Sequence, residues 1–214
     1  MDEYLERMLR ALPLQEVRTY PLSEQIKQYE GELPSRLLSY WKEYGWGAFG
    51  NGMFWLVNPA DFSSTLDAWC HNLVDIDGAY VIARSAFGKL IVWKKGHGKF
   101  MHIAPLEHVI YTFAPNKFVQ TGKEDYSFGV MTSQISPKSL DFEDKHEKPM
   151  FNRAVKKLGP VELDEMYAFV PALSLGGSAE LASLEKVKME EHMHFLAELG
   201  ETEVLHLDTS RFLS

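Results

Sequence analysis

The 214-residue sequence has little of three things: cysteine, cationic charge and continuous apolar stretches. Cys70 is the single cysteine, which excludes an internal disulfide and fits a reducing compartment. No apolar run approaches the roughly 18 residues that a membrane span needs. The first residues, MDEYLERMLRALPL, have no basic region followed by an apolar one, so no signal peptide is predicted. We therefore expect a cytoplasmic protein with no membrane partner, and 45% apolar residues are enough for an ordinary core.

The sequence also lacks the patterns of common catalytic and metal sites. It has no Gly-x-Ser-x-Gly elbow and no phosphate-binding loop. His192 and His194 lie two residues apart in a predicted helix and would point about 200° apart, so they cannot chelate one metal ion. Cys70 lies on an apolar helix face beside Trp69, where a buried and unreactive thiol is expected. The sequence predicts a protein that is not an enzyme and that has no metal and no cofactor.

Basic residues are outnumbered by acidic ones, which gives a net charge of −8. The basic residues are also unevenly distributed along the sequence. Residues 78–106 contain no acid and five cations, interleaved with Phe87, Trp93 and Phe100: Arg84, Lys89, Lys94, Lys95 and Lys99. Such a segment is the best candidate for nucleic-acid binding, but it belongs to an otherwise acidic protein, so we expect no direct nucleic-acid partner. By contrast, residues 180–203 have seven acids against two lysines. An acidic protein suits a basic partner, although acids on solvated helix faces would give the same pattern.

Hydrophobic periodicity predicts a mixture of helices and strands. Helices are expected at Asp2–Leu12, Ser23–Tyr29, Leu33–Tyr44, Ala60–Asn72, Phe151–Leu158 and Leu181–Gly200. Strands are expected at Met53–Val57, Ala79–Ser85, Lys89–Lys94, Phe100–Ala104, His108–Phe113 and Glu203–Leu207. The polar segment Ser136–Met150 is predicted to be a linker or an exposed loop. We expect an α+β fold with a central antiparallel sheet, flanked by N-terminal helices and a long C-terminal helix, and with domains at 1–112 and 113–214 that form one compact unit.

The stretch Leu33–Phe62 is dense in aromatic residues and glycines. Pro34 suits the start of a helix, and Gly45 can end it with a positive φ. Trp41 precedes that glycine on the apolar face of the helix, and Trp55 follows it in the next predicted strand. No residue of the stretch is poised for catalysis, so it is predicted to be a tightly specified scaffold.

The same stretch resembles the GAD-like domain. The shared motifs are Leu-Pro, the helix with Tyr-Trp, Gly-Trp-Gly, Phe-x-Asn-Gly and Asn-Pro-x-Asp-Phe. A second stretch, Leu158-Gly159-Pro160 followed by residues 165–177 (EMYAFVPALSLGG), resembles the C-terminal domain of immunity proteins that begin with a GAD-like domain. Those proteins neutralise DNase effectors of type VI secretion systems. The resemblance implies an immunity protein that binds a cognate toxin, and the alternative is a protein-recognition or scaffold domain with another partner.

If the partner is a DNase, its DNA-binding face must be basic. The acids that we expect to reach this face lie in the proline-bounded loop, in a following turn, and on the polar face of the last helix. Those of the loop and the turn are Asp141, Glu143, Asp144, Glu147, Glu162, Asp164 and Glu165. Glu165 falls inside the second family-like motif and has a structural role as its alternative.

Overall fold

The computed structural model describes residues 2–207, which form helices and strands in mixed order. Its strands are β1 (Leu14–Thr19), β2 (Trp46–Phe49), β3 (Phe54–Leu56), β4 (Ala79–Ser85), β5 (Leu90–Lys94), β6 (Gly98–Ala104), β7 (Val109–Phe113), β8 (Glu165–Phe169), β9 (Leu184–Lys188) and β10 (Glu203–Leu207). Its α-helices are α1 (Glu3–Ala11), α2 (Ser23–Lys27), α3 (Ser35–Tyr44), α4 (Ser63–Cys70), α5 (Lys117–Gln120), α6 (Glu124–Ser133), α7 (Pro137–Leu140), α8 (Phe151–Leu158) and α9 (Met189–Ala197). Short 3-10 turns lie at Pro59–Phe62, Leu173–Leu175 and Leu181–Ser183. The predicted α+β class is confirmed.

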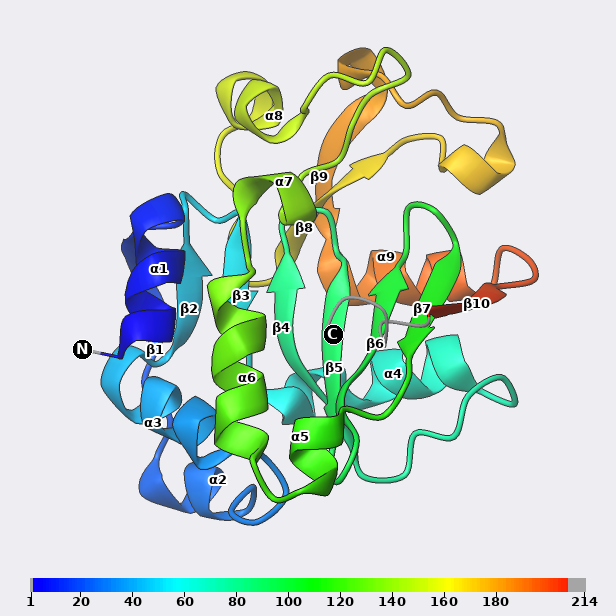
Figure 1. The fold of residues 1–214 in the computed structure, drawn as a ribbon. Coiled ribbons are helices and arrows are strands. Elements are labelled where there is room, and N and C mark those ends of the chain that lie inside the picture. The colour runs from blue at the N-terminus through cyan, green and yellow to red at the C-terminus, as the bar shows by residue number, and fades with distance from the viewer. Residues whose placement is uncertain (1, 208–214) are drawn as a thin grey trace.

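One large sheet runs through the middle of the molecule (Figure 1). Within the described residues it has eight strands in the order β1-β2-β3-β4-β5-β6-β7-β10. Strands β1 to β7 follow one another as antiparallel neighbours. Short turns join β2 to β3 and the strands from β4 to β7, whereas helices α2 and α3 separate β1 from β2 and helix α4 separates β3 from β4. The exception is β10, which lies parallel to β7 at the edge. The predicted antiparallel meander and the predicted strand at Glu203–Leu207 are both confirmed.

Helices cover both faces of this sheet. In Figure 1, α6 lies in front of the strands, with α1 and α3 at its side, and α4 and α9 lie behind. On the front, the Phe128 ring of α6 is 5.9 Å from the Trp93 ring of β5. Behind, the Trp69 indole of α4 donates a 3.1 Å hydrogen bond to the Met193 carbonyl of α9. The sheet therefore packs against helices on both of its faces.

The predicted helix Leu181–Gly200 is wrong over its first half. The structure has a 3-10 turn at Leu181–Ser183, strand β9, and a helix only from Met189 to Ala197. Strand β9 pairs antiparallel with β8 in a separate two-stranded sheet, with Leu184 opposite Phe169. Apolar residues at 181, 184 and 187 fit a helical stripe as well, so the pairing with β8 decides the conformation.

The segment Ser136–Met150 is packed more tightly than a linker. It contains helix α7, and an isolated antiparallel β-bridge pairs the backbone of Glu143 with that of Pro149. Leu140 and Met150 are both buried in the core. The prediction of a linker or an exposed loop therefore holds only for the exposed tip, residues 145–149.

The scaffold predicted around Gly45 is present and places one wall of the site described below. Helix α3 ends at Tyr44, and Gly45 has a φ of 71°. A Cβ atom there would lie 2.7 Å from the Thr19 carbonyl oxygen, so glycine is needed for both its φ and its size. The turn brings Trp46 into register opposite Thr19 of β1.

Candidate functional site

Two of the four predicted loop acids are used inside the protein. Asp141 Oδ1 accepts backbone hydrogen bonds of 2.8 to 3.0 Å from Phe142, Met150 and Phe151, which holds the start of α8. Asp144 is buried and forms a 2.8 Å ion pair with Arg153. Burial of Asp144 opposes its ionisation, but the hydrogen bonds from the Lys148 N–H, Arg153 and the His146 N–H outweigh it and lower the pKa to about 2.

The other two loop acids, Glu143 and Glu147, are exposed. Within the described part of the chain neither forms an ion pair. Their carboxylates can meet a partner without breaking an internal contact, in contrast to those of Asp141 and Asp144.

The predicted turn acids divide in the same way. Glu162 is exposed. Glu165 pairs with Lys186 at 3.1 Å across the small sheet and accepts a hydrogen bond from the Glu162 N–H. Asp164 pairs with Lys188, and this hydrogen bond and charge lower the pKa of Asp164. The Glu165 carboxylate is thus engaged within the chain, which fits the structural alternative, whereas Asp164 borders a cavity. Contact of either residue with a partner stays a prediction.

The five cations of residues 78–106 do not form a basic surface. Arg84 is completely buried, with its guanidinium 4.5 Å from the centre of the Trp55 ring. Lys94 and Lys95 pair with Asp75 and Glu32 at 3.0 and 2.8 Å. The Lys99 ammonium lies 3.9 Å from the Phe113 ring, and the Lys89 ammonium donates to the Ser139 carbonyl. The predicted hairpin exists, but its cations are occupied by neighbours within the chain.

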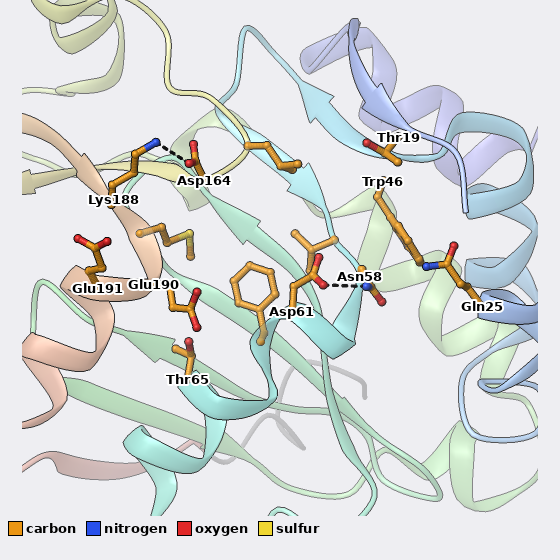
Figure 2. Close-up of a pocket in the computed structure, with 14 residues that line it drawn as sticks. Thr19, Gln25, Trp46, Asn58, Asp61, Thr65, Asp164, Lys188, Glu190 and Glu191 are labelled. Atoms are coloured by element: carbon orange, nitrogen blue, oxygen red, sulfur yellow. Dashed lines mark hydrogen bonds and ion pairs between the residues drawn. The ribbon is translucent and has the colours of Figure 1, made fainter. Parts of the chain in front are cut away.

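A cavity of about 520 Å³ lies where the N-terminal elements meet β9 and α9 (Figure 2). Figure 2 shows Lys188, Glu190 and Glu191 on one side and Thr19, Trp46 and Gln25 on the opposite side. Asn58, Asp61 and Thr65 come from the segment between β3 and the end of α4. The full lining is Thr19, Gln25, Trp46, Val57, Asn58, Asp61, Phe62, Thr65, Leu163, Asp164, Lys188, Met189, Glu190 and Glu191. We call this space the junction cavity.

The junction cavity is acidic. Its lining within the described chain has four carboxylates, those of Asp61, Asp164, Glu190 and Glu191, against the single ammonium of Lys188. That ammonium is paired with Asp164. Burial raises the pKa of Asp61, the 2.9 Å hydrogen bond from Asn58 opposes this, and the charge of Glu190 adds to the rise. The other three acidic residues, Asp61, Glu190 and Glu191, are exposed and form no ion pair among the described residues.

The opposite wall of the junction cavity includes the buried residue Trp46. Trp46 is only 6% exposed, and its indole N–H has no acceptor among the described residues. The indoles of Trp41 and Trp93 are also unpaired, but neither residue lines the cavity. Trp46 and Asp61 belong to fold-forming motifs of the sequence, and only the tertiary fold brings them to the same cavity as Glu190.

Groups with metal-binding or nucleophilic chemistry are dispersed or buried. Among residues 2–207 no three His, Cys, Asp or Glu side chains cluster in a way that could hold a metal ion. The Cys70 thiol is buried, and burial raises its pKa to about 12, which keeps it protonated. None of the helices in this described range has the length and apolar character to cross a membrane.

Comparison with known proteins gives two consecutive family matches. The model of the GAD-like domain matches residues 3–107, and that of "T6SS immunity protein Tdi1, C-terminal" matches residues 132–200. Both resemblances drawn from the motifs are thereby confirmed. The fold is similar to the crystal structure of Atu4351 from Agrobacterium tumefaciens, with a TM-score of 0.85 and 25% identity over 96% of this chain and 92% of that chain. No curated protein matches the sequence.

Proposed function

Because the chain combines a GAD-like domain with the C-terminal domain of the T6SS immunity protein Tdi1, we propose that it binds and neutralises a cognate antibacterial toxin. The toxin that we propose is a DNase effector of a type VI secretion system. The match at residues 132–200 is the observation on which this proposal rests. Since a DNase damages DNA in the cytoplasm, we place the immunity protein there as well.

The physical basis that we propose for inhibition is occlusion of a basic surface. A DNase needs a cationic face to hold DNA, whose phosphates present dense negative charge. A protein of net charge −8 is attracted to such a face, and opposite charges speed association. The cations at residues 78–106 are occupied internally, which favours a protein partner over direct binding of nucleic acid.

Of the acids predicted to contact the toxin, we propose that Glu143, Glu147, Glu162 and Asp164 do so through their exposed carboxylates. Asp141, Asp144 and Glu165 support this surface by holding the loop and the small sheet in place. In this proposal the protein acts by binding alone, without catalysis, metal or cofactor.

The test is protection of cells by co-expression. The product of the neighbouring gene is the candidate toxin, because immunity proteins are encoded beside their toxins. Expressed alone it should degrade DNA and stop growth, and co-expression of the chain should restore both DNA integrity and growth. A purified complex with a nuclease-dead toxin should show binding, and an effector from an unrelated system is the control. Binding without protection would identify a recognition or scaffold protein instead.

A further inference from the structure

An exposed turn, residues 162–164, leads into β8. Glu162, Leu163 and Asp164 are all exposed, and the side chain of Leu163 is apolar and 49% exposed. We infer that Leu163 is an apolar anchor that the toxin buries, and that Arg84 is the positioning residue that holds it in place. This inference rests on the proposed function and adds an apolar contact to the acidic ones.

Arg84 holds the backbone of this turn from the large sheet. Its Nη2 donates to the carbonyl oxygens of Glu162 and Leu163 at 3.0 and 2.8 Å. Its Nη1 donates to the Ser85 carbonyl at 3.3 Å, and the guanidinium group lies 4.5 Å from the centre of the Trp55 ring. The exposed leucine is therefore bonded to strands β3 and β4, which belong to the other family-matched part of the chain.

The chemistry of Arg84 indicates that the position of the turn matters. The side chain is completely buried, and among residues 2–207 no carboxylate pairs with it. Buried charges are costly, and apolar side chains of similar volume often give equal or greater stability. A planar guanidinium group offers what an apolar side chain does not, because its donors hold two carbonyl oxygens in fixed places. Fixing the position of Leu163, rather than stability alone, accounts for an arginine here.

Further hydrogen bonds complete the turn. The Met189 N–H of α9 donates to the Asp164 carbonyl at 2.8 Å, and the Glu165 N–H of β8 donates to the Glu162 carbonyl at 3.2 Å. The Glu165 carboxylate accepts a 3.0 Å hydrogen bond from the Glu162 N–H. The turn is thus formed before any partner binds. A preformed loop loses little conformational freedom on binding, so the burial of its exposed side chain contributes more to affinity.

The residues on either side of Leu163 indicate the chemistry of the partner surface. Figure 2 shows Asp164 beside Lys188, its ion-pair partner. Glu162 forms no ion pair within the described part of the chain. An apolar side chain next to an unpaired acid fits an apolar socket that is bordered by lysine or arginine. Protein interfaces commonly have an apolar centre and a polar rim, and a DNA-binding face supplies the basic border.

The first experiment measures affinity for a nuclease-dead form of the neighbouring gene's product. Leu163→Ala should weaken binding about fivefold or more, because the exposed half of the leucine side chain no longer gains from burial. Leu73→Ala is the matched control, since Leu73 is 48% exposed and follows α4. The control should change affinity by no more than about twofold, as energetically neutral surface positions do. Thermal unfolding verifies that both variants are folded.

A double-mutant cycle tests the role of Arg84. Arg84→Lys keeps a cation but loses the planar group that holds both carbonyls. It should weaken toxin binding about threefold or more, within the range of measured coupling energies. In the Leu163→Ala background the same substitution should change affinity by about twofold at most, because position matters only while the leucine is present. Equal effects in the two backgrounds would show that Arg84 serves the fold alone.

Hydrogen exchange of the wild-type protein tests the preformed turn without a variant at Arg84. The amides of Glu165 and Met189, which bond the carbonyls of the turn, should exchange about tenfold or more slowly than in an unstructured peptide. Exchange of both amides at the peptide rate would overturn the positioning role.

The outcomes separate this inference from the proposed function. Wild-type affinity of Leu163→Ala for the toxin would overturn the inference and leave the proposed function intact. Failure of the wild type to bind the toxin would overturn the proposed function, and this inference with it.

Discussion

A buried arginine joins the two family-matched parts of the chain. The Arg84 guanidinium donates to the carbonyl oxygens of Glu162 and Leu163 at 3.0 and 2.8 Å, and no carboxylate is paired with it among the described residues. Burial lowers the pKa of Arg84 to about 9. From sequence alone, a charged residue in a strand is expected at the surface. For this reason Arg84 was grouped with the lysines of the predicted basic segment. Its carbonyl partners lie 78 and 79 residues away and could not be foreseen.

His102 on β6 makes the stability depend on pH. Burial, and then the charges of Lys99 and Lys89, lower its pKa from 6.5 to about 3. Between these values the unfolded chain binds a proton that the folded protein does not. The free energy of unfolding therefore rises with pH in this range, and stability is lost as the pH falls below about 6.5. Urea unfolding at pH 7, 6 and 5 should show this loss.

The variant His102→Gln removes the titrating group and serves as the comparison. Its stability should change less between pH 7 and pH 5 than that of the wild type. This interval lies above the range in which most carboxylates titrate. Parallel pH profiles for the two proteins would contradict the assignment to His102.

At the scale of elements, the predicted scaffold can be tested by removing a tryptophan from the packing of α3 against β2. Trp41 is fully buried, with its ring 5.5 Å from that of Tyr29 and 5.7 Å from that of Trp46. Trp41→Ala should lower the free energy of unfolding by about 3–5 kcal/mol, the usual cost of emptying a large core site. Trp55→Ala should do the same, because Trp55 is buried and its indole bonds the Gly52 carbonyl. Unchanged thermal unfolding together with lost toxin binding would make these residues interface anchors instead.

Elements with strong local patterns were predictable from the sequence, and those decided by pairing were not. The bounds of β4, α8 and β10 agree with the prediction. Strand β1 was missed because it is an exposed edge strand without alternating apolar residues. Strand β9 was assigned to a helix, since its partner β8 cannot be read from the segment itself.

The candidate site shows the same division. Asp164 and the polar face of the last helix were predicted as contact residues. Asp164, Glu190 and Glu191 line the junction cavity, and their contact with a toxin stays a prediction. Asp61 was not, because it is separated from Glu190 by more than one hundred residues and its motif indicates only fold formation. Periodicity predicts which face of an element is polar, but it does not show which faces meet.

At the scale of the whole molecule, the two family-matched parts share one core. The Tyr167 N–H donates to the Ala86 carbonyl at 2.8 Å, and Trp69 bonds the Met193 carbonyl. In addition, β10 extends the sheet of β7 from the other end of the chain. We therefore expect the proposed domains, 1–112 and 113–214, to unfold in a single transition. The sequence allows a direct test, because all five tryptophans lie within residues 1–112.

Leu184 is a fully buried residue of β9, in the second part of the chain. Leu184→Ala should lower the free energy of unfolding by about 2–5 kcal/mol. If the parts unfold together, the thermal midpoint from tryptophan fluorescence, which reports on the first part, must fall as far as the midpoint from far-UV circular dichroism. The neighbouring exposed substitution Glu185→Gln is the control and should leave both midpoints in place. A fluorescence midpoint that stays at the wild-type value while the dichroism transition broadens or splits would show two independent domains. The junction cavity would then lie between moving parts, whereas a single transition means that its two walls are held in place by the same core.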